Sequence, residues 1–201
     1  MNINIEDDTD ITFFINFLLL GKTDSRKSTL INILLEEMKS IEGRSGFSTT
    51  SKNIIVYKKS RFPKRFYDVK GIENEVTVQN YINIMKDFNI NNSSSFDSLH
   101  SIFYCIEYKR KGTIIEKIEN KLFKILIKFI IPIYFIITKT PYNPIRGSSN
   151  KKTENIRQNQ RNIIIKAIQN LIITSFENRK GPAQLFFDKY AQIFFVNLIM
   201  D

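Results

Sequence analysis

The sequence has little of several residue types, and each shortage restricts the class of protein. Cys105 is the only cysteine among 201 residues, so an internal disulfide framework is excluded. His100 is the only histidine, and without a cluster of His and Cys we do not expect a protein-made zinc site. Seven Gly and five Pro are too few for a linker-rich or collagen-like chain.

Long apolar runs are also lacking. The run at 13–20 is too short to cross a bilayer, and the run at 122–137 is broken by Lys124, Lys128 and Pro132. The acidic N-terminus has the wrong sign of charge for a secretory leader. With the single cysteine, these features predict a cytoplasmic protein without a transmembrane segment.

Acidic side chains are outnumbered, because 30 Lys and Arg against 20 Asp and Glu give a formal charge of +10. Such a charge suits nucleic acid, an anionic membrane or a phosphorylated ligand, but it also follows from a composition rich in Ile, Asn and Lys. The densest basic cluster lies at 58–65. We interpret this cluster first as a solvent-exposed edge of the sheet, and contact with RNA or anionic lipid is the alternative interpretation.

Apolar segments of two kinds alternate along the chain and predict an α/β fold. Strand-like runs lie at 12–20, 52–60, 65–68, 99–106, 131–138 and 192–197. Helical patterns lie at 28–38, 76–88, 113–129, 154–176 and 182–188. This order predicts a mostly parallel sheet with helices on both faces. A turn at 61–64 predicts one antiparallel pair, Thr113 is an expected N-cap, and 141–152 is an expected loop.

The composition, 42% hydrophobic and 25% charged, predicts one domain over 1–201, with its core at about 12–198 and an extension at 1–11. Only four residues follow the last predicted strand, so we expect a sheet without the closing helix that usually ends such folds. A fragment, a truncated chain or a partner that covers the sheet face would each account for this.

The most informative stretch is LLLGKTDSRKSTLIN, residues 18–32, which lies where a strand ends and a helix begins. A phosphate-binding loop requires that context, because backbone N–H groups at a helix N-terminus donate to phosphate oxygens. Gly21 stands at the opening turn, Lys27 where it reaches the outer phosphates, and Ser28 where its hydroxyl ligates magnesium. The spacing matches GxxxxGK[ST], except that Arg26 replaces the second glycine.

Two further loops have positions that suit a nucleotide site. Asp68 ends a predicted strand, where a carboxylate holds magnesium through water, and Gly71 can offer its N–H to a γ-phosphate. The polar loop 43–51 contains Thr49 and Thr50, either of which could complete the magnesium shell. A plain solvated loop is the alternative for each hydroxyl.

Thr138 and Lys139 close another predicted strand, where a lysine stem can lie along a purine ring. Pro141 stands at the place of the carboxylate that normally reads guanine, so the choice between guanine and adenine stays open.

Together these segments resemble the G domain of P-loop GTPases, in the group of septins, Era-like and ribosome-binding GTPases and avirulence-induced, immune-associated GTPases. GKTDSRKSTLIN is similar to the pattern GKTGSGKSTLIN, FSTTSKN and YDVKGIENE resemble switch regions, and IITKT resembles a base-recognition strand. The resemblance covers roughly residues 13–197. It implies a three-layer fold with a six-stranded, mostly parallel sheet and one antiparallel edge strand.

The resemblance also implies roles for individual residues. The nucleotide, GTP or GDP, would be bound by Gly21, Lys22, Thr23, Asp24, Ser25, Arg26, Lys27, Ser28, Thr29, Asp68, Gly71, Thr138 and Lys139. Mg²⁺ would be held by Ser28, by Asp68 and by Thr49 or Thr50. Lys27, Gly71 and the switch threonine, Thr49 or Thr50, would serve catalysis.

Three departures bear on activity: Asp24 and Arg26 replace loop glycines, and Pro141 replaces the base-reading acid. Asp24 also brings negative charge to a phosphate site. Ile72 stands where many GTPases have a water-orienting glutamine, which implies slow turnover or help from a partner or homodimer. We therefore expect a GTP-binding molecular switch with slow or partner-assisted hydrolysis. The alternative is a degenerate G domain that serves as a protein-interaction module without hydrolysis.

Overall fold

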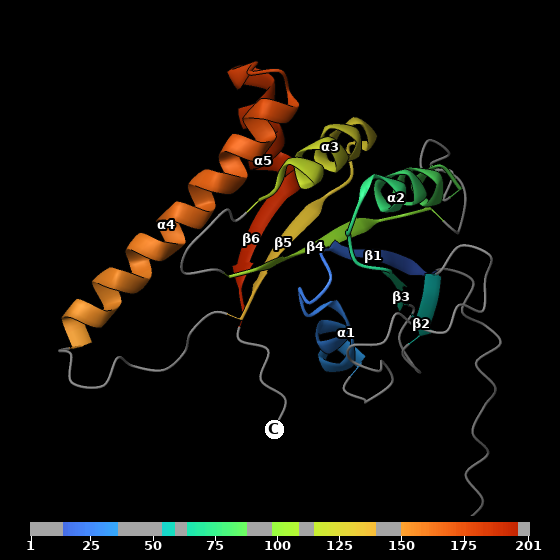
Figure 1. The fold of residues 1–201 in the computed structure, drawn as a ribbon, viewed down its shortest axis with the longest axis horizontal. Coiled ribbons are helices and arrows are strands. Elements are labelled where there is room, and N and C mark those ends of the chain that lie inside the picture. Colours follow the sequence, from blue (N-terminus) through green and yellow to red (C-terminus); the bar gives the residue numbers. More distant parts are fainter. Residues whose placement is uncertain are drawn as a thin grey trace, which may run out of the picture.

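A six-stranded sheet forms the centre of the protein (Figure 1). The computed structural model describes residues 14–35, 54–58, 64–87, 98–108, 115–139 and 150–196. The strands are β1 (Ile15–Gly21), β2 (Ile54–Lys58), β3 (Lys64–Val69), β4 (Ser101–Glu107), β5 (Ile133–Thr138) and β6 (Ala191–Phe195). Their order is β2-β3-β1-β4-β5-β6, and all neighbours are parallel except β2 and β3. The prediction of one antiparallel edge strand is confirmed.

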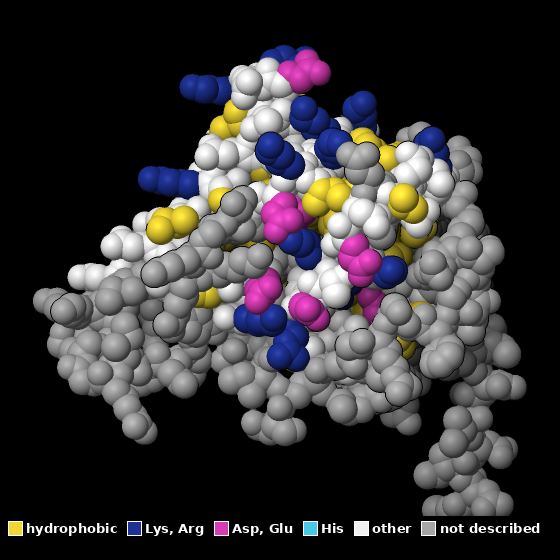
Figure 2. Space-filling view, viewed as in Figure 1, with side chains coloured by type: hydrophobic (Ala, Val, Ile, Leu, Met, Phe, Trp, Pro, Cys, Tyr) yellow, Lys and Arg dark blue, Asp and Glu magenta, His cyan; other side chains and the backbone are white. Residues whose placement is uncertain are grey.

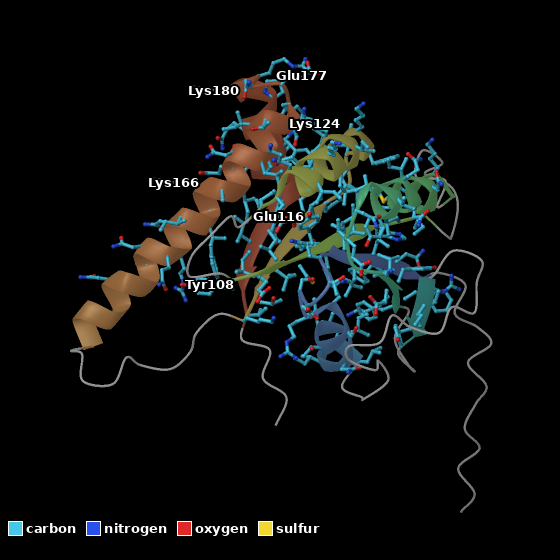
Figure 3. The ribbon with its side chains drawn as sticks, viewed as in Figure 1. Tyr108, Glu116, Lys124, Lys166, Glu177 and Lys180 are labelled. Atoms are coloured by element: carbon cyan, nitrogen blue, oxygen red, sulfur yellow. The ribbon has the colours of Figure 1, made fainter. Side chains whose placement is uncertain are left out.

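Helices cover both faces of the sheet, which confirms the three-layer prediction (Figure 1). They are α1 (Lys27–Leu35), α2 (Glu75–Asp87), α3 (Lys117–Leu126) with the 3₁₀ turn η1 (Ile127–Phe129), α4 (Asn150–Ser175) and α5 (Lys180–Tyr190). Figure 3 shows the side chains that fill the space between the sheet and the helices.

Two apolar cores separate along the strands because successive side chains point to opposite faces. Leu18 and Leu20 of β1 belong to the larger core, which contains residues of α2, α3, α4 and α5. Leu19 belongs to the smaller core, in which Leu30 and Ile31 of α1 pack. β1 is thus buried on both faces, and this explains why its sequence is a continuous apolar run.

Two helix starts differ from the sequence prediction by four residues. The N-cap of α3 is Glu116, not Thr113, which lies outside the described residues. The N–H of Glu116 donates to the buried carboxylate of Glu119 at 2.8 Å, so the helix begins where this side chain satisfies a free donor. α4 begins at Asn150 rather than at residue 154, because the polar residues predicted as the end of a loop form its first turn.

The carboxyl ends of the parallel strands meet at one edge of the sheet and position the site. Gly21 lies beside Cys105 in the register of β1 and β4, and Glu107 lies beside Thr138 in the register of β4 and β5. Asp68 ends near the same edge beside Leu19. In such folds ligands bind at this edge.

The described helices include none that is both long enough and apolar enough to cross a membrane. Other predictions lie outside the described residues: the extension at 1–11, the first three residues of the turn at 61–64, Thr49, Thr50 and Pro141.

Candidate functional site

The loop between β1 and α1 opens on Gly21, whose φ of 144° lies in a region that residues with a side chain rarely adopt. A Cβ atom here would lie 2.4 Å from the carbonyl oxygen of Cys105 on β4. The loop then turns back on itself, as the N–H of Ser25 donates to the carbonyl of Lys22 at 3.2 Å. Gly21 is therefore required for both the conformation and the close approach of two strands.

Asp24 and Arg26 keep the path that glycines would give the loop. Both residues have left-handed φ angles, 66° for Asp24 and 63° for Arg26, and both side chains are exposed. Left-handed residues that alternate with other conformations turn successive N–H groups toward one point and create an anion-binding concavity. The backbone angles at the two replacements are therefore compatible with an anion-binding loop.

Lys27 begins α1 and lies inside the loop. Its ammonium Nζ donates to the carbonyl oxygens of Gly21 at 3.2 Å and Lys22 at 3.0 Å. The side chain is 8% exposed, and burial lowers the pKa of Lys27 despite the opposing charge of Asp68. Both of these carbonyl acceptors are neutral, and an ammonium forms stronger hydrogen bonds with charged phosphate oxygens.

Ser28 and Asp68 meet beside this lysine. The hydroxyl of Ser28 donates to Asp68 Oδ2 at 3.4 Å. Burial raises the pKa of Asp68, opposed by the Lys27 charge and the Ser28 hydrogen bond. The other oxygen, Oδ1, is buried and has no hydrogen-bond partner in the described part of the chain. A hydroxyl and a carboxylate with an unused oxygen are the hard oxygen ligands that Mg²⁺ prefers, so the pair fits this ion.

The segment after β3 lies on the phosphate loop. The N–H of Ile72 donates to the carbonyl of Gly21 at 3.0 Å, and Thr23 Oγ1 donates to Glu73 Oε1 at 3.0 Å. A Cβ atom on Gly71 would lie 2.4 Å from the backbone nitrogen of Thr23. Gly71 is thus required by the approach of two backbones, and the predicted second switch contacts the loop directly.

Thr138 and Lys139 bring the end of β5 to the same loop. The buried hydroxyl of Thr138 lies 3.1 Å from the carbonyl oxygen of Ser25 and 3.3 Å from that of Ile106. Lys139 has a left-handed φ of 56°, and its Nζ donates to Glu107 Oε1 at 2.9 Å. Glu107 was not predicted. The place of this acidic residue at a strand end beside Thr138 was its only sequence signal.

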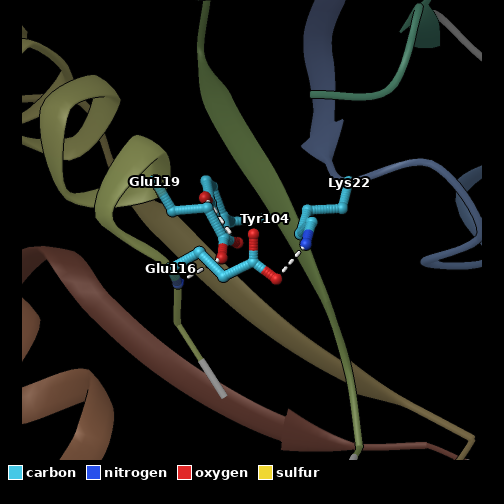
Figure 4. A network of polar contacts seen from close by, with 4 residues as sticks. All are labelled: Lys22, Tyr104, Glu116 and Glu119. Carbon is cyan, nitrogen blue, oxygen red and sulfur yellow. Dashed lines mark hydrogen bonds and ion pairs between the residues drawn. The ribbon is translucent and has the colours of Figure 1, made fainter. Parts of the chain in front are cut away.

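A polar network on the other side of the loop was also missed (Figure 4). Lys22 forms an ion pair with Glu116 at the start of α3. Glu119 accepts hydrogen bonds from the Glu116 N–H at 2.8 Å and the Tyr104 hydroxyl at 3.1 Å. The sequence feature that could have predicted this network is a pair of glutamates three residues apart at the start of an amphipathic helix.

The structure therefore brings most of the predicted residues together at one edge of the sheet. They are Gly21, Lys22, Thr23, Asp24, Ser25, Arg26, Lys27, Ser28, Thr29, Asp68, Gly71, Thr138 and Lys139. Thr29 is 2% exposed in the first turn of α1. Thr49 and Thr50 lie outside the described residues.

The sheet order, the loop after β1 and the segment after β3 define a P-loop protein with the GTPase type of α/β fold. The sequence profile of the 50S ribosome-binding GTPase family matches residues 16–139, and the chain belongs to this family. The family bears out the resemblance to P-loop GTPases that the motifs indicated. A comparison with curated protein sequences gives no match.

Solved structures with the same fold include Toc33 from Arabidopsis thaliana in complex with GDP and Mg²⁺. It is 13% identical, with a TM-score of 0.61 over 92% of this chain and 71% of that one. A structure of the chloroplast translocon components atToc33 and psToc159, for which dimerisation is important for GTPase activity, is 11% identical with a TM-score of 0.56, over 92% and 70%. A probable GTP-binding protein, engB, is 13% identical with a TM-score of 0.50, over 91% and 89%. At these identities the likeness shows the fold alone.

Proposed function

We propose that the protein binds GTP and GDP with Mg²⁺ and acts as a molecular switch whose hydrolysis is slow or assisted by a partner. One observation carries this proposal: Asp24 and Arg26 adopt left-handed conformations, so the loop keeps its anion-binding path around the buried Lys27. The bound GDP and Mg²⁺ of the Arabidopsis structure with the same fold support the choice of ligand.

The residues take the following roles in this proposal. Phosphate oxygens would accept hydrogen bonds from the N–H groups of the loop and from the ammonium of Lys27. To bind phosphate, this ammonium would leave its hydrogen bonds with the carbonyl oxygens of Gly21 and Lys22. Ser28 and Asp68 would hold Mg²⁺, and the switch threonine, Thr49 or Thr50, would complete its shell. The ion, when bound, neutralises charge on the phosphate oxygens.

The end of β5 would bind the base. Thr138 joins this strand end to the phosphate loop through a hydrogen bond with the carbonyl of Ser25. The stem of Lys139 would stack on the purine ring. The ammonium of Lys139 is already held by Glu107, so the stem is positioned before the nucleotide arrives. A preference for guanine over adenine is part of the proposal.

Slow hydrolysis follows from the second switch. Ile72 is 1% exposed, has no polar group on its side chain, and uses its N–H to hold Gly21. It therefore cannot orient an attacking water, a task that another chain would take over. A homodimer through the switch face is the partner we favour, because dimerisation is important for GTPase activity in the translocon structure with the same fold.

Titration with fluorescent GTP and ATP analogues, with and without Mg²⁺, tests the proposal. We expect micromolar binding that needs Mg²⁺ and prefers GTP. Lys27→Met keeps an unbranched apolar stem and removes the ammonium, so we expect at least a tenfold loss of affinity. Absence of binding to either nucleotide by the unaltered protein would overturn the proposal.

A degenerate G domain that serves as an interaction module is the second candidate. It is favoured by the carboxylate of Asp24, which places negative charge on the loop that would bind phosphates. Replacing Asp24 and Arg26 together by glycine separates the two candidates. Binding that appears only in the glycine variant supports degeneration, and equal binding by both proteins supports the switch.

A further inference from the structure

A line of four lysines runs along the outer side of α3 and η1. In the stretch 115–129, the only exposed side chains are those of Lys117, Lys121, Lys124 and Lys128. Their spacing of four, three and four residues places them within an arc of about 60° on the helix, over a length of about 16 Å. We call these four residues the lysine line.

The two acidic residues of the same segment, Glu116 and Glu119, belong to the polar network beside the phosphate loop. Glu116 forms its ion pair with Lys22 of the phosphate loop. Glu119 is 1% exposed and accepts hydrogen bonds from Tyr104 and from the Glu116 N–H. Both carboxylates take part in the network shown in Figure 4.

An exposed apolar side chain ends the lysine line. Ile130 follows η1, is 60% exposed, and has φ 54° and ψ 39°. A β-branched residue in the left-handed region is a conformational outlier, and its side chain gains no burial in return. The protein therefore holds an isoleucine outward, two residues after Lys128.

The surroundings of the lysine line are also basic. Figure 2 shows Lys and Arg side chains gathered over α3 and the neighbouring end of α5. Lys124 on α3 and Lys180 on α5 lie on the face drawn in Figure 3, with Glu177 at its far end. The face as a whole presents more positive than negative charge.

We propose that the lysine line docks on the surface of an anionic membrane, with Ile130 entering the boundary between headgroups and acyl chains. Lysine ammonium groups in one row meet a plane of lipid phosphates without needing a fixed geometry, and an apolar side chain beside them adds burial. The aromatic rings of the stretch 115–130 are buried at Phe123 and half-buried at Phe129, which argues against base stacking by single-stranded RNA. The proposal does not depend on nucleotide binding.

Flotation with lipid vesicles tests the lysine line. We compare vesicles of phosphatidylcholine alone with vesicles that contain three parts phosphatidylcholine to one part phosphatidylserine. We expect binding only to the second kind, and weaker binding as salt is added. Replacing Lys117, Lys124 and Lys128 by glutamine is expected to weaken binding about a hundredfold, at about fivefold for each lysine near the surface.

A matched control separates the lysine line from net charge. Lys86 on α2, Lys166 on α4 and Lys189 on α5 are exposed but do not form a line. Replacing these three by glutamine removes the same charge, and we expect less than a tenfold loss. Equal losses in the two variants, or equal binding to both kinds of vesicle, would overturn the proposal. Both variants must unfold at the temperature of the unaltered protein.

Two further arms complete the test. Ile130→Asn suits the left-handed conformation, so we expect a melting temperature that is unchanged or higher together with weaker vesicle binding. Unchanged vesicle binding by this variant would remove Ile130 from the proposal. In the second arm, mixed-sequence RNA competes with the vesicles. If the unaltered protein binds RNA but not vesicles, and the lysine-line variant loses this RNA binding, the membrane proposal is overturned in favour of RNA.

Discussion

Arg26 shows how a single residue stores conformational free energy in the phosphate loop. A residue with a Cβ atom in the left-handed region costs about 1–2 kcal/mol relative to its favoured conformations, and Arg26 has a φ of 63°. We expect Arg26→Gly to raise the free energy of unfolding by about 1 kcal/mol, measured by urea denaturation. Arg26→Ala is the control, because it removes the same side chain but keeps the Cβ. If the Gly and Ala variants are equally stable, the strain is absent.

Glu119 is the residue at which pH should act on stability. Burial raises the pKa of Glu119 above its ordinary value of 4.5, against hydrogen bonds from Glu116 and Tyr104 and the charge of Lys22. A raised pKa means that the folded protein prefers the protonated form. The stabilising contribution of protonated Glu119 to the free energy of unfolding is fully present below pH 4.5. This contribution is lost as the pH rises through the pKa of Glu119 in the folded protein.

Glu119→Gln cannot titrate, so it isolates this effect. We expect the stability of the unaltered protein, relative to the variant, to fall as the pH rises from 4.5 toward neutrality. Urea midpoints of both proteins across this range measure the difference. Two parallel curves would show that burial does not disfavour the charged form of Glu119.

At the scale of elements, the ion pair of Lys22 and Glu116 joins the phosphate loop to the start of α3. The two side chains are 31% and 43% exposed, so solvent screens the attraction. We expect a double-mutant cycle with Lys22→Met and Glu116→Gln to give a coupling of about 0.5 kcal/mol in unfolding free energy. Strictly additive effects of the two changes would show that the loop and the helix are not coupled through this pair.

Elements with a strong apolar pattern were predicted well, and their ends were not. The run that became β1 was unmistakable because Leu18, Leu19 and Leu20 are buried on both faces. The start of α3 was misplaced because a glutamate, a weaker N-cap type than threonine, is held there by Glu119. The start of α4 was misplaced because polar composition does not distinguish an exposed first turn from a loop.

At the scale of the whole molecule, the sequence predicted the parallel sheet and the edge where ligands bind, because both follow from element order. It did not predict the pairs that join distant segments. Lys22 and Glu116 are 94 residues apart, and Lys139 and Glu107 are 32 apart, so neither pairing leaves a local pattern. The left-handed conformation of Arg26 was not predictable either, because a sequence pattern does not determine φ for a residue other than glycine.

Because Cys105 is buried, the rate at which its thiol is labelled reports how often the core around it opens. The only thiol of the chain is inaccessible, lies beside Gly21 in the sheet, and has a pKa raised by burial to about 12. The thiol packs in the smaller core beside Leu30 and Ile31 of α1. A thiol reagent can therefore react only when this core opens, at a rate set by the free energy of that opening. We expect labelling of the native protein to be orders of magnitude slower than in urea, and to slow further when Mg²⁺ and GTP hold the loop closed. A nucleotide that binds without slowing the reaction would place the opening elsewhere in the fold.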